Sequence, residues 1–208
     1  EMCIRDRHKA FVVSRMSIEV FRPVEKYYDV DVETWIIPGK GANFPRGYEM
    51  YKGGQLVAKA ICNWALVDTV TGKLIASKDY DMGTYSMDEA PELSIPRRFR
   101  IPKELKFQEV ESSKVAMSMI DINMHMNNTV YASKLYDNID DAEKYFITSI
   151  NLRYVHEAPL GSEFKVYRSD AVDPGEMDYR AEKLIYFYTE ADGMLNLEAA
   201  VGLKKVTI

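Results

Sequence analysis

Hydrophobic and polar residues alternate along most of this chain, in runs that are typical of β-strands. In residues 28–37, Val30 and Val32 fall on one face of an extended chain, while Asp31 and Glu33 fall on the other. Turn-type sequences rich in Gly, Pro, Asn and Asp separate the runs. The segments that we predict as strands are residues 10–21, 28–37, 55–68, 146–156, 163–170, 179–189 and 195–207.

One segment, residues 128–138, has a helical pattern instead. Tyr131 and Leu135 are four residues apart and therefore share one face of a helix. Asn127 or Asn128 can cap its N-terminus, because an amide oxygen accepts a hydrogen bond from a free backbone N–H there. The second half of the chain is thus predicted to fold as a single helix against a curved antiparallel sheet.

The two halves share an order of elements, which indicates a tandem repeat within an α+β fold. We expect an N-terminal domain over residues 8–80, a charged linker over 81–106 and a C-terminal domain over 107–208. The first copy lacks the leading strand and helix of the second, so we expect it to be truncated. Residues 1–7, "EMCIRDR", do not continue the strand pattern and are interpreted as a non-native leader.

Composition and charge exclude several classes of protein. The chain has 208 residues and a net charge of −5, which argues against nucleic-acid binding as its main activity. No apolar run approaches the roughly 20 residues of a membrane span. Cys3 and Cys62 lie far apart in sequence, which favours a reducing cytoplasm, and a plastid location would need a transit peptide ahead of residue 1. No group of His, Cys and acidic residues has metal-ligand spacing, so neither a metal nor another cofactor is predicted.

Residues 121–128, "DINMHMNN", interleave polar and apolar side chains. If residues 118–125 are extended, Asp121, Asn123 and His125 share one face, while Ile122, Met124 and Met126 point the other way into apolar packing.

The Asn pair that follows opens the predicted helix, whose first N–H groups are unpaired and carry partial positive charge. We therefore expect Asn127 and Asn128 to bind substrate, with donors near a developing oxyanion. The alternative interpretation is that they serve only as helix caps.

The pattern D-x-N-x-H-x-N-N-x-x-Y over residues 121–131 resembles the signature of the acyl-ACP thioesterases. "VETW" at 32–35, "NWALVD" at 63–68 and "RYVHEA" at 153–158 are also similar to segments of that family. The resemblance implies tandem hot-dog domains, in which an antiparallel sheet wraps a helix and the first domain shapes the acyl pocket. It also implies hydrolysis of the thioester between a fatty acyl chain and acyl carrier protein (ACP).

The resemblance carries Asp121, Asn123, His125 and Glu157 over as a catalytic network. Many plant members place a Cys next to the Glu, but Ala158 stands here, so a cysteine nucleophile is not expected. Water activated by a general base is the expected nucleophile. Glu157 and His125 are the two candidates for that base. The alternative is a structural role for His125 at the junction between strand and helix.

The expected partner is ACP, which is strongly acidic. Five basic residues lie between positions 97 and 106 and include Arg97, Arg98 and Arg100, which we predict to bind this partner. The alternative is an ordinary solvated linker. Because hot-dog sheets commonly pair, a homodimer is also possible. The rival functions are an acyl-CoA thioesterase of the hot-dog type and a noncatalytic acyl-binding remnant.

Overall fold

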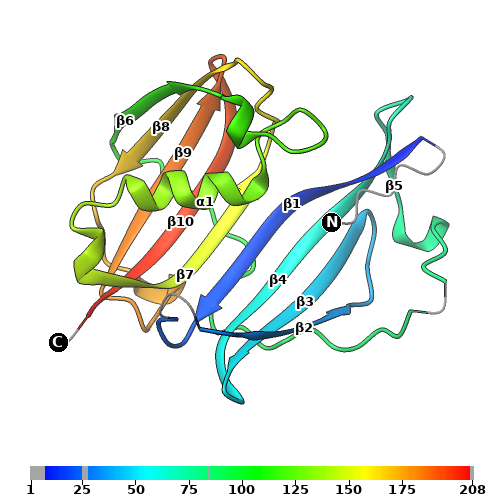
Figure 1. Cartoon of the computed structure of the whole chain (residues 1–208), viewed down its shortest axis with the longest axis horizontal. Helices are drawn as coiled ribbons and strands as arrows, with labels where there is room; N and C mark the ends of the chain where they lie inside the picture. The colour runs from blue at the N-terminus through cyan, green and yellow to red at the C-terminus, as the bar shows by residue number, and fades with distance from the viewer. Residues whose placement is uncertain (1–7, 25–27, 84, 207–208) are drawn as a thin grey trace. The chain divides into compact units, whose positions relative to one another are not determined.

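The computed structural model describes residues 8–24, 28–83 and 85–206 (Figure 1). The predicted leader, residues 1–7, lies outside the described residues. The chain divides into two compact units, residues 1–97 and residues 98–208. The division falls inside the segment 81–106.

The first unit is built from antiparallel strands in the order β2-β3-β4-β1, with the short β5 paired to β4. Their bounds are β1 Lys9–Val20, β2 Asp31–Ile36, β3 Asn43–Lys52, β4 Gln55–Asp68 and β5 Leu74–Ile75. Strand β4 begins and ends at the residues predicted from its pattern. The described residues of this unit form no α-helix and one 3-10 turn, Ser77–Asp79.

Strand β3 was not predicted as a strand of its own, because Pro45 and Gly47 interrupt its pattern. Gly47 is paired with Trp35 of β2. A Cβ atom at Gly47 would lie 2.6 Å from the indole ring, so the ring occupies the space that a side chain would fill. The glycine thus belongs to the strand and makes room for an aromatic neighbour.

The second unit contains the α-helix and five antiparallel strands in the order β7-β10-β9-β8-β6. The helix α1 spans Asn128–Asp137 and ends one residue before the predicted limit. The strands are β6 Phe107–Lys114, β7 Tyr145–Tyr154, β8 Glu163–Ser169, β9 Lys183–Ala191 and β10 Met194–Lys205. Short 3-10 turns lie at Met117–Met119, Ala142–Lys144 and Gly175–Met177. One helix against an antiparallel sheet is the hot-dog arrangement that the resemblance implies.

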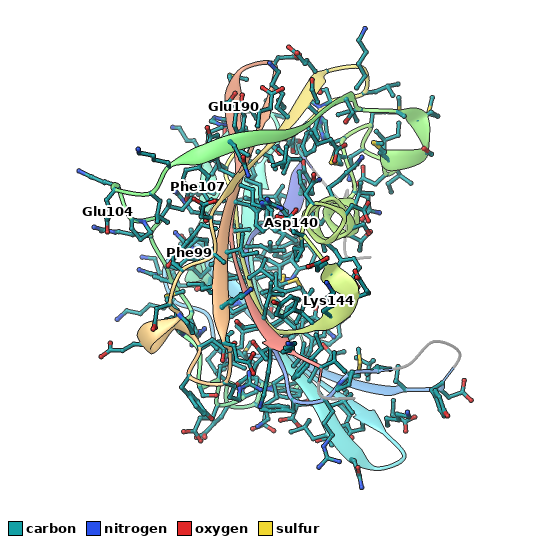
Figure 2. All side chains as sticks on the ribbon, turned by 90° about the vertical axis from the view of Figure 1, so that its left-hand side faces the viewer. Phe99, Glu104, Phe107, Asp140, Lys144 and Glu190 are labelled. Carbon is teal, nitrogen blue, oxygen red and sulfur yellow. The ribbon has the colours of Figure 1, made fainter. Side chains whose placement is uncertain are left out.

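Apolar side chains cover both faces of this second sheet. On one face, α1 buries Tyr131 and Leu135, and the Tyr131 ring meets that of Phe164 edge-on at 6.0 Å. On the other face, Phe99 packs with Tyr186 and other residues of the sheet. Figure 2 shows Phe99 and Phe107 on one side of the sheet, and Asp140 and Lys144, which follow α1, on the other. Among the described residues, no helix is long and apolar enough to span a bilayer.

Candidate functional site

The polar motif lies in a tight turn that precedes α1. Ile120 pairs with Met126 in an isolated antiparallel bridge, and the Asp121 N–H donates to the His125 carbonyl at 2.9 Å. Inside this closure the Met124 N–H donates to the Asp121 carbonyl at 3.1 Å. Met124 has a φ of 65°, the left-handed conformation that ends many three-residue hairpin loops.

The prediction that residues 118–125 are extended was therefore wrong. Two of the apolar residues that were predicted to pack inward are exposed, Ile122 by 72% and Met124 by 50%, whereas Met126 is buried. The physical reason is the side chain of Asp121, whose Oδ1 accepts the Asn123 N–H at 2.8 Å. An Asp that bonds the backbone two residues on stabilises a turn rather than a strand.

The turn brings Asp121 and Asn123 together. Besides the backbone bond, the Asn123 side-chain amide donates to Asp121 Oδ2 at 3.3 Å. The carboxylate therefore orients the carboxamide. Two of the four residues of the predicted network, Asp121 and Asn123, are thus in contact with each other.

His125 and Glu157 come together from distant parts of the sequence. His125 Nε2 lies 3.2 Å from Glu157 Oε2. The two chain segments are joined by backbone pairing, because His125 forms a bridge with Pro159 and the Met126 N–H donates to the Ala158 carbonyl at 2.9 Å. The loop before α1 and the segment after β7 thus form one side of the site.

The His125–Glu157 pair is open to solvent. The side chain of His125 is 34% exposed and that of Glu157 is 61% exposed. The negative charge of Glu157 also affects the pKa of a buried side chain. Burial raises the pKa of Tyr131 to about 12, and the negative charge of Glu157 adds to that increase. Water can therefore reach the carboxylate, which still lies close to the first turns of α1.

The N-terminus of α1 is capped by Asn127. Its side-chain oxygen accepts the Thr129 N–H at 3.0 Å and the Thr129 hydroxyl at 2.9 Å. The Val130 N–H donates to the Asn127 carbonyl at 2.9 Å. Of the two candidate caps, Asn127 is thus the one used, and the exposed Asn128 is the first residue of the helix.

The predicted basic residues lie where the two units divide. Arg97 ends the first unit, whereas Arg98 and Arg100 begin the second. All three are exposed, and Phe99 between them is buried against the sheet face opposite α1. In the described part of the second unit, no hydrogen bond or ion pair joins Arg98 or Arg100 to the turn before α1.

Two further buried side chains, Cys62 and Asn196, bear on which groups can react and on how they are held. Burial raises the pKa of the Cys62 thiol to about 12, so this cysteine stays protonated at neutral pH. The buried Asn196, absent from the predicted set, bonds both the Tyr131 hydroxyl and the backbone next to Glu157. The only signal in the sequence is a polar residue inside the apolar run "MLNLEAAVGL".

Comparisons with known proteins relate this geometry to a family. Residues 103–190 match the family model for the acyl-ACP thioesterase C-terminal domain. No curated protein sequence gives a significant match to the chain.

Solved structures share the fold. The acyl-ACP thioesterase from Bacteroides thetaiotaomicron is 21% identical, with a TM-score of 0.78 over 95% of this chain and 77% of that chain. The 12:0-ACP thioesterase from Umbellularia californica is 19% identical, with a TM-score of 0.71 over 96% of this chain and 77% of that chain. A MaoC-like dehydratase from Phytophthora capsici is 15% identical, with a TM-score of 0.57 over 95% of this chain and 72% of that chain.

A fold shared with a dehydratase does not by itself identify a thioesterase. The similarity to the thioesterases rests instead on the matched segment, which contains the motif at 121–131 as well as Glu157. Residues 103–190 of the second unit are thus similar to the C-terminal domain of the acyl-ACP thioesterases.

Proposed function

We propose that the chain hydrolyses the thioester of fatty acyl-ACP to release a free fatty acid and ACP. The observation that carries this proposal is the contact between His125 and Glu157, 3.2 Å apart beside the N-terminus of α1. A carboxylate and an imidazole in contact, both open to water, can activate water and return a proton to a leaving group.

In the proposed reaction, Glu157 accepts a proton from a water molecule as the water oxygen attacks the thioester carbon. The C–O bond forms while the carbonyl electrons move onto oxygen. The tetrahedral intermediate then collapses, the C–S bond breaks, and the proton passes through the Glu157–His125 pair to the departing sulfur. The second assignment makes His125 the base and Glu157 the group that orients it, and the contact between them serves either one.

The oxyanion requires donors, and the first turn of α1 can supply them. Asn127 satisfies the Thr129 N–H, so the Asn128 N–H is the backbone donor at the tip of the helix. The Asn123 carboxamide, oriented by Asp121, is a second polar group, in the turn that precedes α1. Removing one such donor from an enzyme typically costs ~3 kcal/mol of barrier.

A cavity within the first unit supports a binding role for that unit toward the acyl chain. Its volume is about 950 Å³, at the upper end of the roughly 300–1,000 Å³ typical of small-molecule sites. Most of its lining is aromatic or aliphatic, including Phe11, Ile36, Phe44, Trp64, Tyr80 and Met82. Such a lining suits an apolar chain.

Thiol release from acyl-ACP and acyl-CoA esters of matched chain length tests the function. We expect faster release from acyl-ACP, at a rate that falls as salt weakens attraction between the acidic carrier and the basic residues near position 100. Equal rates on both esters would favour the acyl-CoA thioesterase. Binding of acyl groups without thiol release would leave the noncatalytic acyl-binding module.

A further inference from the structure

Asn196 occupies an unusual position in β10. Its side chain is only 1% exposed. The register of β10 against β9 shifts between Leu195 and Leu197, so Asn196 is the extra residue of a β-bulge. Bulges re-aim side chains, and a buried amide in a bulge needs partners for both its donors and its acceptor.

The carboxamide of Asn196 has those partners. Its Nδ2 donates to the Tyr131 hydroxyl at 3.1 Å and to the His156 carbonyl at 2.5 Å. Its Oδ1 accepts from the Thr189 hydroxyl at 2.8 Å. One side chain thus joins α1, β9 and the segment after β7.

The backbone of Asn196 holds the same segment. Its carbonyl accepts the Val155 N–H at 2.9 Å and the His156 N–H at 3.3 Å. Strand β7 ends at Tyr154, and Glu157 follows His156. Three hydrogen bonds from a single buried residue therefore fix the two residues that immediately precede Glu157.

Glu157 depends on this anchoring because its own side chain is 61% exposed. An exposed glutamate samples many rotamers unless its backbone and one polar contact define its direction. The backbone on the far side is held at Pro159, through the bridge with His125. Asn196 holds the near side. The short segment that carries Glu157 is therefore fixed on both sides, with its carboxylate against His125.

We propose that Asn196 is a positioning residue, whose buried carboxamide fixes the backbone before Glu157 so that the carboxylate meets His125. Its effect on turnover rests on the proposed hydrolase function, whereas its effect on the His125–Glu157 contact does not.

Kinetics of the full chain test the effect on turnover. Asn196→Asp keeps the shape and the oxygen facing Thr189 but removes both N–H donors. We expect kcat to fall by on the order of 10- to 100-fold, because a displacement of about 1 Å can cost that much. KM should stay within about twofold if substrate binding is unchanged. Thr189→Val removes only the hydroxyl that orients the carboxamide, and should lower kcat less.

The matched control is Thr148→Val, which removes another buried hydroxyl of the same unit, bonded to Asp178 at 2.6 Å. It should lower the melting temperature as Thr189→Val does, with kcat unchanged. Folded Asn196→Asp and Thr189→Val proteins with wild-type kcat would overturn the proposal.

A spectroscopic readout does not need turnover. The chain has three histidines, so the ring nitrogens of His125 can be assigned by NMR with His8→Gln and His156→Gln variants. Glu157→Gln defines the resonance change that follows loss of the carboxylate. Asn196→Asp, or Thr189→Val if the former does not fold, should shift the His125 resonances in the same direction, and Thr148→Val should not.

Wild-type His125 resonances in both test variants would overturn the positioning role. If the wild-type chain releases no thiol, the hydrolase proposal fails, while the His125 resonances still decide the role of Asn196.

Discussion

Glu157 meets His125 across a backbone bridge, with the carboxylate oxygen 3.2 Å from the imidazole Nε2. The pair is largely solvated, and exposed ion pairs contribute about 1 kcal/mol or less to folding. We therefore expect Glu157→Gln to change the free energy of unfolding in urea by no more than about 1 kcal/mol. A loss several times larger would mean that the pair serves mainly to stabilise the fold.

The Asn127 cap should contribute measurably to stability. Its side chain satisfies the Thr129 N–H, so Asn127→Ala should lower the free energy of unfolding by about 1 kcal/mol in urea denaturation. Asn128→Ala is the matched control, because Asn128 is exposed at the first helical position, where Ala is at least as favourable. Equal losses in the two variants would contradict the assignment of Asn127 as the cap.

Glu111 of β6 gives the second unit a pH-dependent contribution to its stability. Burial by itself would raise the pKa of Glu111, but hydrogen bonds from Lys134, Asn138 and Ser113 outweigh it and lower that pKa below its usual 4.5. Because the folded-state pKa is depressed, the contribution is complete above about pH 4.5 and is lost as the pH falls through the folded-state pKa.

The free energies of unfolding of wild type and Glu111→Gln, measured by thermal denaturation between pH 7 and pH 3, test this pH dependence. Wild type should be the more stable at pH 7, by about 1 kcal/mol. The difference should shrink below pH 4.5. A difference that is constant over the whole range would show that the charge of Glu111 is not involved.

The left-handed conformation of Met124 makes a further prediction. Such a conformation costs a non-glycine residue about 1–2 kcal/mol, which Gly relieves, although the greater entropy of Gly in the unfolded chain cancels part of this gain. Met124 is half exposed, so little packing is lost, and Met124→Gly should raise the urea midpoint or leave it unchanged. Ile122→Gly, at a position without a positive φ, should lower the midpoint. Similar losses in both variants would contradict this turn geometry.

The sequence predicted the elements whose pattern is uninterrupted. The limits of β4 and nearly those of α1 follow from the local sequence, because turn residues bound the strand and because Tyr131 and Leu135 lie on one face of the helix. The pairing of His125 with Glu157 came from the family resemblance, since no local pattern connects residues 32 positions apart.

The failures have local physical causes. The turn at 121–125 carries a Met at the left-handed position where hairpin signals usually show Gly or Asn, so its alternating pattern suggested a strand. Asn196 was missed because its value lies in contacts with Tyr131, Thr189 and His156, which only the folded sheet brings together.

The rate of thiol release from acyl-ACP by wild type and by Glu157→Gln, both shown to be folded, tests the central claim most directly. General acid–base groups typically contribute about 10²- to 10⁴-fold, and we expect the variant to lose kcat in that range. Glu163→Gln, which changes another exposed acid of the same unit, should retain the wild-type rate. A Glu157→Gln protein that releases thiol as fast as wild type would contradict the account.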